Sequence, residues 1–137
     1  MANRRFFLKS ALVVAGGVAL GQPKLLRAKE QKFPRGIIFT AKSPGRWKAK
    51  AGSHAPKVTV KGQQVTIETA HPMSQQHYIV RHTLVAEDGT LLGAKTFYPN
   101  DKKAVSTYTV KGEMPKKLYA TSFCNKHDFW MTEVEIG

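Results

Sequence analysis

Short segments in which apolar and polar residues alternate dominate the chain from residue 55 to its end. Strict alternation is typical of β-strands with one buried face, and glycine-containing turns such as residues 61–63 and 87–90 separate neighbouring segments. No stretch has a convincing helical period. The pattern predicts about seven strands in an all-β, immunoglobulin-like antiparallel β-sandwich. The expected strands cover residues 58–60, 65–69, 78–86, 91–98, 105–110, 118–123 and 131–136.

Residues 1–28 differ from the rest of the chain and have the features of a targeting segment. Arg4 and Arg5 precede Phe-Phe-Leu-Lys, and an apolar run rich in Ala, Val and Gly follows over residues 10–21. The run is too short to span a bilayer comfortably, so we expect no stable membrane span. The segment closely resembles a bacterial twin-arginine signal peptide, which implies export of the folded protein to the periplasm or another extracytoplasmic compartment. The alternatives are an uncleaved N-terminal anchor and an ordinary secretory signal.

Residues 29–45 form a basic connector that Pro and Gly interrupt. The short apolar run over residues 37–39 is a candidate for an additional edge strand. Trp47 is expected to pack on the domain that follows, which we place at residues 46–137.

The formal net charge of +13 first suggests a nucleic-acid partner. Five of the 22 bases lie in residues 1–28, which contain no acid, so 17 bases face nine acids in the remainder. Such a field attracts small anions as readily as a polyanion. The chain has no helix-turn-helix pattern, zinc-finger pair or single-strand-binding motif. We therefore expect no nucleic-acid partner.

Cys124 is the only cysteine, so no intramolecular disulfide can form. In an exported protein a free thiol is either buried and inert or used, and metal ligation would both use and protect it. His127 follows three residues later, a separation at which a thiolate and an imidazole can reach one ion from a tight turn. The pair alone leaves both interpretations open, because a lone cysteine is usually a small buried apolar group.

Other histidines could complete a coordination sphere with this Cys/His pair. His54 stands just before an expected strand, and His71 and His77 bracket a loop that contains proline. Because the loops of a sandwich cluster at its ends, these side chains can converge at one end. His82 has odd register relative to His77, so we expect it to point to the opposite face, as a surface or supporting residue and not as a ligand.

The surroundings of these residues resemble the iron site of the superoxide reductases, the neelaredoxin and desulfoferrodoxin family. The matching motifs are His54-Ala-Pro, His71-Pro-Met followed six residues on by His77-Tyr-Ile, and Cys124-Asn-Lys-His127. The resemblance implies an immunoglobulin-like sandwich that holds one mononuclear non-heme iron, with four in-plane histidines and an axial cysteine. Without further cysteines there is no Cys₄ rubredoxin-like domain, which places the chain with the single-iron members.

The resemblance implies a one-electron reduction of superoxide to hydrogen peroxide, with iron cycling between Fe²⁺ and Fe³⁺. An external one-electron donor, rubredoxin-like or a cytochrome, would re-reduce the iron. The family usually carries Glu-Lys before the first histidine, where this chain has Gly52 and Ser53. We expect Lys126 to supply the missing charge that attracts superoxide, with Lys50 and Lys57 as alternatives.

Two features of the site remain open at this point. We expect backbone N–H groups after Cys124, near Asn125 and Lys126, to hydrogen-bond the cysteine sulfur. The alternative function is a non-catalytic iron-binding electron-transfer module with the same site, and a sandwich that only binds a protein partner is a third hypothesis. The sequence leaves the identity of the donor and the choice between a monomer and a homo-oligomer undecided.

Overall fold

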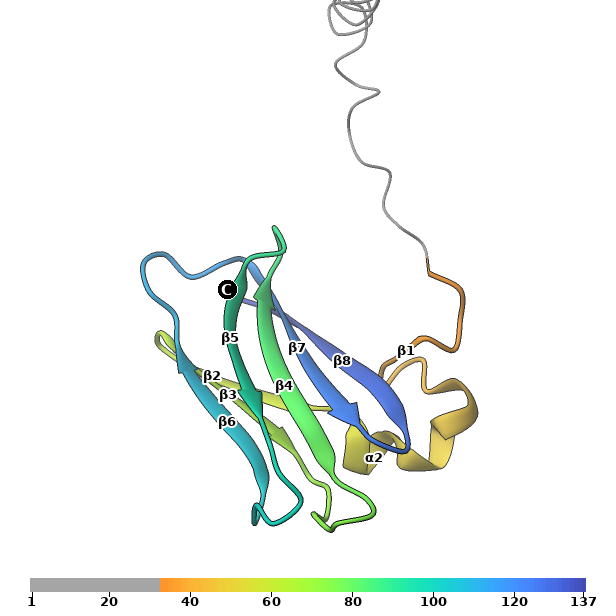
Figure 1. Ribbon diagram of the computed structural model, residues 1–137. Coiled ribbons are helices and arrows are strands. Elements are labelled where there is room, and N and C mark those ends of the chain that lie inside the picture. Colours follow the sequence, from red (N-terminus) through yellow and green to blue (C-terminus); the bar gives the residue numbers. More distant parts are fainter. Residues whose placement is uncertain (1–32) are drawn as a thin grey trace, which may run out of the picture. The chain divides into compact units, whose positions relative to one another are not determined.

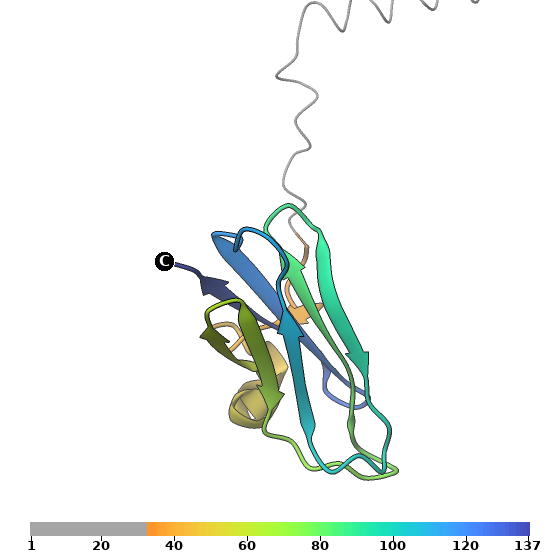
Figure 2. The same cartoon turned by 90° about the vertical axis from the view of Figure 1, so that its left-hand side faces the viewer.

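A sandwich of two β-sheets forms the part of the chain that the computed structural model describes, residues 33–137 (Figure 1). The predictions for residues 1–28 lie outside the described residues. One sheet has the strand order β1-β8-β7-β4-β5 and the other β2-β3-β6, and Figure 2 shows the two layers. The strands are β1 (Ile38–Phe39), β2 (Lys57–Lys61), β3 (Gln64–Thr69), β4 (Ile79–Ala86), β5 (Leu91–Thr96), β6 (Ala104–Thr109), β7 (Lys117–Cys124) and β8 (Asp128–Glu135).

The predicted all-β sandwich is confirmed, with one strand more than the seven counted from the alternating segments. The additional strand is β1, the expected edge strand in the apolar run over residues 37–39. It runs parallel to β8, whereas the other neighbouring strands pair antiparallel. The sandwich is therefore antiparallel, as predicted, except at this added edge.

The core between the sheets contains the inward-facing residues of the alternating segments. Val65 and Ile67 of β3 meet Leu84 of β4, Leu118 and Ala120 of β7, and all five are buried. Burial of a side chain the size of Val or Leu contributes ~1.5–3 kcal/mol, so this cluster carries much of the stability of the sandwich.

His82 lies in a buried polar network between the two sheets. Its Nε2 is 2.8 Å from the hydroxyl of Thr69, and its Nδ1 is 2.8 Å from the hydroxyl of Ser106. The Thr69 hydroxyl also lies 2.8 Å from that of Ser122. Burial lowers the pKa of His82 to about 4, so the ring is neutral and can donate at one nitrogen and accept at the other.

Of the two places expected for His82, the surface is wrong, because the residue is fully buried; as expected, it stays outside the group of candidate metal ligands. Alternation from His77 does not locate it, because β4 begins only at Ile79 and has an irregular register at its start. Such an irregularity shifts which side chains face the core.

Two short helices join β1 to β2 and place the first histidine. They are the 3-10 helix η2 (Gly45–Lys50) and the α-helix α2 (Ala51–His54), so His54 ends a helix instead of lying in a loop. Helices of six and four residues are too short to produce a recognisable period in the sequence. Within the described residues, no helix is long and apolar enough to cross a bilayer. Helix α2 lies near the turn between β7 and β8, at the lower end of the sandwich in Figure 1.

Candidate metal centre

The five residues predicted to bind metal lie together at this end of the sandwich. Their ligand atoms are all within 4.8 Å of one another. Three separate segments contribute them: helix α2, the loop between β3 and β4, and the end of β7 with the turn that follows. In that order, the residues are His54, His71 and His77, and Cys124 and His127.

Four ring nitrogens are linked by three contacts of equal length. His71 Nε2 lies 3.0 Å from His77 Nε2, which lies 3.0 Å from His127 Nδ1. His127 Nδ1 in turn lies 3.0 Å from His54 Nε2. Nitrogens this close to one another can bind a single metal ion at the usual metal–imidazole distance of ~2.0–2.1 Å.

The thiol of Cys124 lies beside this group of nitrogens. Its Sγ is 3.2 Å from His77 Nε2 and 3.8 Å from His127 Nδ1, and the residue is only 1% exposed. Four imidazoles and one thiolate form a donor set suited to a single divalent transition metal ion such as iron. The residues present therefore fit the metal that the resemblance implies.

The two buried histidines are oriented by carbonyl groups. His54 Nδ1 lies 3.0 Å from the carbonyl oxygen of Lys50 and 2.8 Å from the Ser53 hydroxyl, and His71 Nδ1 contacts the carbonyl oxygen of Pro72. An N–H that donates to a carbonyl fixes the tautomer and leaves Nε2 free to bind a metal. Ser53 thus supports the first histidine at a position where the family usually has a charged residue.

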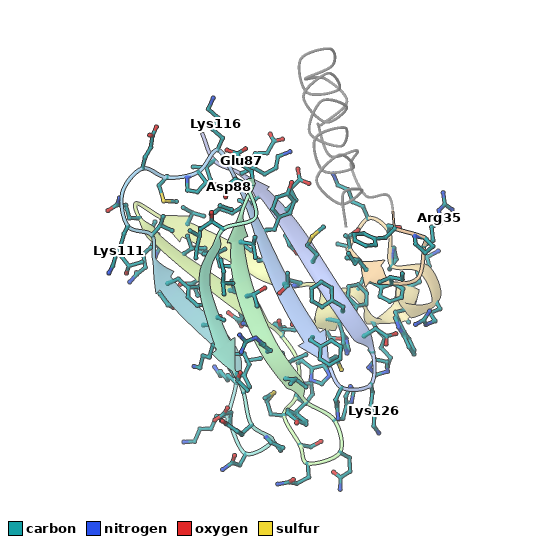
Figure 3. The ribbon with its side chains drawn as sticks, turned by 45° about the horizontal axis from the view of Figure 1, so that its top comes forward. Arg35, Glu87, Asp88, Lys111, Lys116 and Lys126 are labelled. Atoms are coloured by element: carbon teal, nitrogen blue, oxygen red, sulfur yellow. The ribbon has the colours of Figure 1, made fainter. Side chains whose placement is uncertain are left out.

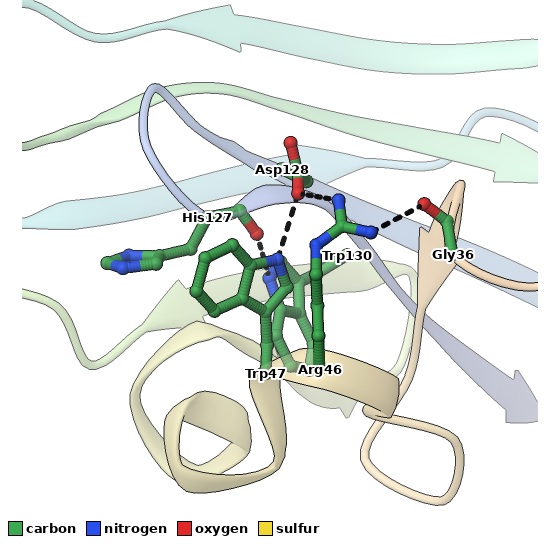
Figure 4. Close-up of polar contacts among 6 residues, drawn as sticks. All are labelled: Gly36, Arg46, Trp47, His127, Asp128 and Trp130. Atoms are coloured by element: carbon green, nitrogen blue, oxygen red, sulfur yellow. Dashed lines mark hydrogen bonds and ion pairs between the residues drawn. The ribbon is translucent and has the colours of Figure 1, made fainter.

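The more exposed histidines are held differently. Hydrogen bonds between Ser74 and the backbone of His77, at 3.0 and 3.1 Å, close the loop that carries His77. The ring of His127 meets the indole of Trp47 edge-on, with centroids 4.6 Å apart. The indole N–H of Trp130 donates to the carbonyl oxygen of His127 at 2.8 Å (Figure 4). As expected from the sequence, Trp47 packs on the domain.

Asn125 joins the two loops of the site, a role that the sequence analysis missed. Its backbone N–H donates to the carbonyl oxygen of Tyr78 at 3.2 Å, so the expected bond to the sulfur of Cys124 is wrong for Asn125. Its side-chain oxygen accepts the Tyr78 N–H at 3.0 Å, and its amide group donates to the Gln76 carbonyl at 3.0 Å. An Asn in a tight turn commonly forms hydrogen bonds with the backbone nearby. The residues around Asn125 in the sequence do not indicate that its partners lie in another loop.

Burial keeps the imidazoles in their neutral, metal-binding form. Burial, together with the nearby imidazoles, lowers the pKa of His54 to about 4. Burial and neighbouring positive charges also lower the pKa of His77 and of His127, and Lys50 and Lys126 are among these charges. Lys126 is exposed in the turn between β7 and β8, at the end of the sandwich opposite the one with Glu87 (Figure 3).

Comparisons with known proteins agree with this geometry. The family model of desulfoferrodoxin matches residues 46–133. A superoxide reductase (neelaredoxin) from Ignicoccus hospitalis is similar in structure, with 29% identity, a TM-score of 0.63 and coverage of 77% of this chain and 98% of its own. The one-iron superoxide reductase from Giardia intestinalis has 26% identity and a TM-score of 0.56, over 61% of this chain and 98% of its own. The superoxide reductase from Treponema pallidum has 27% identity and a TM-score of 0.54, over 62% of this chain and 69% of its own.

A comparison with curated proteins found no match. The family match covers more than half of the chain and includes all five converging residues. The chain therefore belongs to the desulfoferrodoxin family.

Proposed function

We propose that this protein is a superoxide reductase that acts outside the cytoplasm and uses a single iron ion. The observation that carries the proposal is the arrangement of four imidazole nitrogens, linked by three contacts of 3.0 Å, with one buried cysteine sulfur beside them. The similarity to solved superoxide reductases supports the reaction class. The overall reaction takes one superoxide anion, one electron and two protons to one molecule of hydrogen peroxide.

An iron ion held by His54, His71, His77, Cys124 and His127 would supply the electron for the reduction. The chain contributes neutral imidazoles, because burial lowers the pKa of His54 and His71, and a thiolate that is shielded from solvent. His77 and His127 are only partly buried, so water can reach this side of the site and deliver protons. Lys126 and Lys50 add positive charge there, which favours approach of the superoxide anion.

The alternative is a non-catalytic iron-binding electron-transfer module. It is favoured by Gly52 and Ser53, which stand where the family usually has Glu-Lys. The Ser53 hydroxyl donates to the Lys50 carbonyl at 3.2 Å and carries no charge toward the site. Both functions need the same five ligands, so metal binding alone does not separate them.

Rapid mixing of the reduced, iron-loaded protein with superoxide separates the two functions. In a superoxide reductase, superoxide oxidises the reduced iron in a second-order reaction near the diffusional ceiling of ~10⁸–10⁹ M⁻¹s⁻¹. The reaction yields one molecule of hydrogen peroxide per protein. Slow oxidation without stoichiometric peroxide would support the electron-transfer module. In either case, a thiolate-to-iron absorption band should appear in the oxidised protein and vanish in Cys124→Ser.

Two finer proposals concern the environment of the enzyme. Residues 1–28 support export by the twin-arginine pathway, and fractionation of cells that express an Arg4→Lys, Arg5→Lys variant tests it. The variant should stay in the cytoplasm, and unchanged export would exclude this pathway. An external one-electron donor, a rubredoxin-like protein or a cytochrome, then has to restore the reduced state, and candidates can be compared by their rates of reduction of the oxidised protein.

A further inference from the structure

Asp128 follows the last histidine and has an unusual backbone. Its φ is +68°, and among the described residues it is the only non-glycine residue with positive φ. The left-handed region is uncommon for a residue with a side chain, although Asp and Asn tolerate it better than most. Such a conformation persists where the surrounding structure holds it in place. The contacts of the Asp128 side chain therefore need an explanation.

The carboxylate of Asp128 accepts two hydrogen bonds from helix η2. Arg46 Nη2 lies 2.6 Å and Trp47 Nε1 lies 2.8 Å from the same oxygen, Oδ2 (Figure 4). Arg46 is itself anchored, because its Nη1 donates to the Gly36 carbonyl at 3.4 Å and its guanidinium lies 5.0 Å from the ring centroid of Phe39. We call Asp128, Arg46 and Trp47 the Asp128 latch. It joins segments more than 80 residues apart.

The latch contacts the metal centre through Trp47. The indole meets the ring of His127 at 81° with centroids 4.6 Å apart. His127 presents Nδ1 to the other ligands, whereas His54 and His71 present Nε2. In the part of the chain that the structure describes, Nε2 of His127 has no hydrogen-bond partner. The edge contact with Trp47 therefore restrains this ring, as carbonyl groups restrain the other two.

The latch also sets the distance between two ligands. Helix η2 continues directly into α2, which ends at His54. The carboxylate of Asp128 therefore connects the segment that carries His54 to the turn that carries His127. The 3.0 Å contact between His54 Nε2 and His127 Nδ1 joins these two segments. The contact of the same length between His71 and His77 lies within one loop and does not depend on the latch.

We propose that Asp128 is a positioning residue of the metal centre, which holds His127 and His54 in register through Trp47 and Arg46. The inference rests on the metal site of the proposed function but not on superoxide turnover. A purely structural ion pair on the surface would leave metal binding unchanged when it is removed. Surface pairs of this kind contribute little to stability, and both partners here are substantially exposed, so metal binding is the informative measurement.

The test measures Co²⁺ binding to the full chain, purified without metal, in wild type and in Asp128→Gly. Glycine keeps the left-handed backbone without steric cost and removes the acceptor of both hydrogen bonds. We expect Co²⁺ affinity to fall about 10- to 100-fold, the usual effect of removing a group that orients a metal-binding histidine. The thiolate-to-cobalt absorption band at saturating Co²⁺ should shift, because it reports the arrangement of the ligands and not the stability of the fold.

Asp88→Gly is the matched control. Its carboxylate also accepts a backbone N–H, from Thr90 at 2.9 Å, but in the turn at the opposite end of the sandwich (Figure 3). This variant should bind Co²⁺ like wild type. Wild-type affinity and an unshifted band in Asp128→Gly would overturn the proposal. If the wild-type chain itself failed to bind Co²⁺ or iron, the proposed metal site would fail instead, so the two failures are distinguishable.

Two milder variants keep the test valid if Asp128→Gly folds poorly. Asp128→Asn tolerates the same backbone and keeps one side-chain oxygen for Trp47, so its Co²⁺ affinity should lie between wild type and glycine. Trp47→Phe keeps an aromatic edge but removes the N–H donor. The losses of Co²⁺ affinity in Trp47→Phe and Asp128→Gly should not add fully in the double variant, because both substitutions break the same hydrogen bond between Trp47 and Asp128. Fully additive losses would contradict the latch. So would an Asp128→Asn variant that binds Co²⁺ no more tightly than Asp128→Gly.

Discussion

The β4–β5 hairpin and the metal end of the sandwich are held together in different ways. Within the hairpin, contacts are local: the Ala86 N–H donates to the Thr90 carbonyl, and Asp88 accepts the Thr90 N–H. At the metal end, contacts join distant segments, as Asn125 does with Tyr78 and Asp128 with Arg46. The middle of the sandwich is an apolar core with one buried polar network. A change in each region should therefore affect a different property of the molecule.

The largest effect on stability is expected from the core, with little effect on the site. Leu84→Ala removes a fully buried side chain between the sheets and leaves a cavity. The free energy of unfolding should fall by about 2–5 kcal/mol, measured by denaturant titration of the metal-free protein. The absorption spectrum of the folded, metal-loaded variant should match wild type. A changed spectrum would show that core and site are coupled, contrary to the comparison.

The buried polar network should make stability depend on pH. The pKa of His82 is about 4 in the folded protein and ~6.5 in the unfolded chain, so the unfolded state binds the proton first as pH falls. The free energy of unfolding should therefore decrease between pH 6.5 and pH 4, by up to about 3 kcal/mol from this group. His82→Asn should flatten this part of the profile relative to wild type. Parallel profiles would indicate that His82 titrates normally.

The bridging contacts at the metal end should matter for metal retention as well as for folding. Asn125→Ala removes two side-chain hydrogen bonds between the β7–β8 turn and the loop that carries His77. We expect a loss of about 1–3 kcal/mol in stability and faster release of bound metal to a chelator, by about tenfold. Asn100→Ala, an exposed asparagine in another loop, is the control. Equal release rates for both variants would contradict the role of Asn125.

The smallest effect is expected from the exposed charge beside the site. Lys126→Ala removes one of several positive charges, so the rate with superoxide should fall about two- to fivefold at low salt. Because salt screens exposed charges, the difference from wild type should shrink at high ionic strength. The same measurement on Lys50→Ala shows which lysine contributes more. If neither variant changes the rate or its salt dependence, other lysines provide the attraction.

The sequence predicted the elements whose signals are local. Alternation located the strands, and the motifs around His71, His77 and Cys124 identified residues that the structure brings together. Helix α2 was not predicted because a helix of four residues is too short to show a helical period in the sequence. The burial of His82 was not predicted because the irregular start of β4 is not visible in the alternation of apolar and polar residues. The partners of Asn125 and Asp128 lie about 50 and 80 residues away, and a single sequence has no signal for such contacts.

The spread of the ligands along the chain has a mechanical consequence. His54 and His127 are 73 residues apart, so an ion bound to both would connect the first and last parts of the domain. Because the unfolded chain does not hold these ligands together, the free energy of binding such an ion would add to the free energy of unfolding. With a single cysteine, the chain has no disulfide to do the same work. Removing the ion would thus lower the stability of the folded domain as well as abolish its reaction.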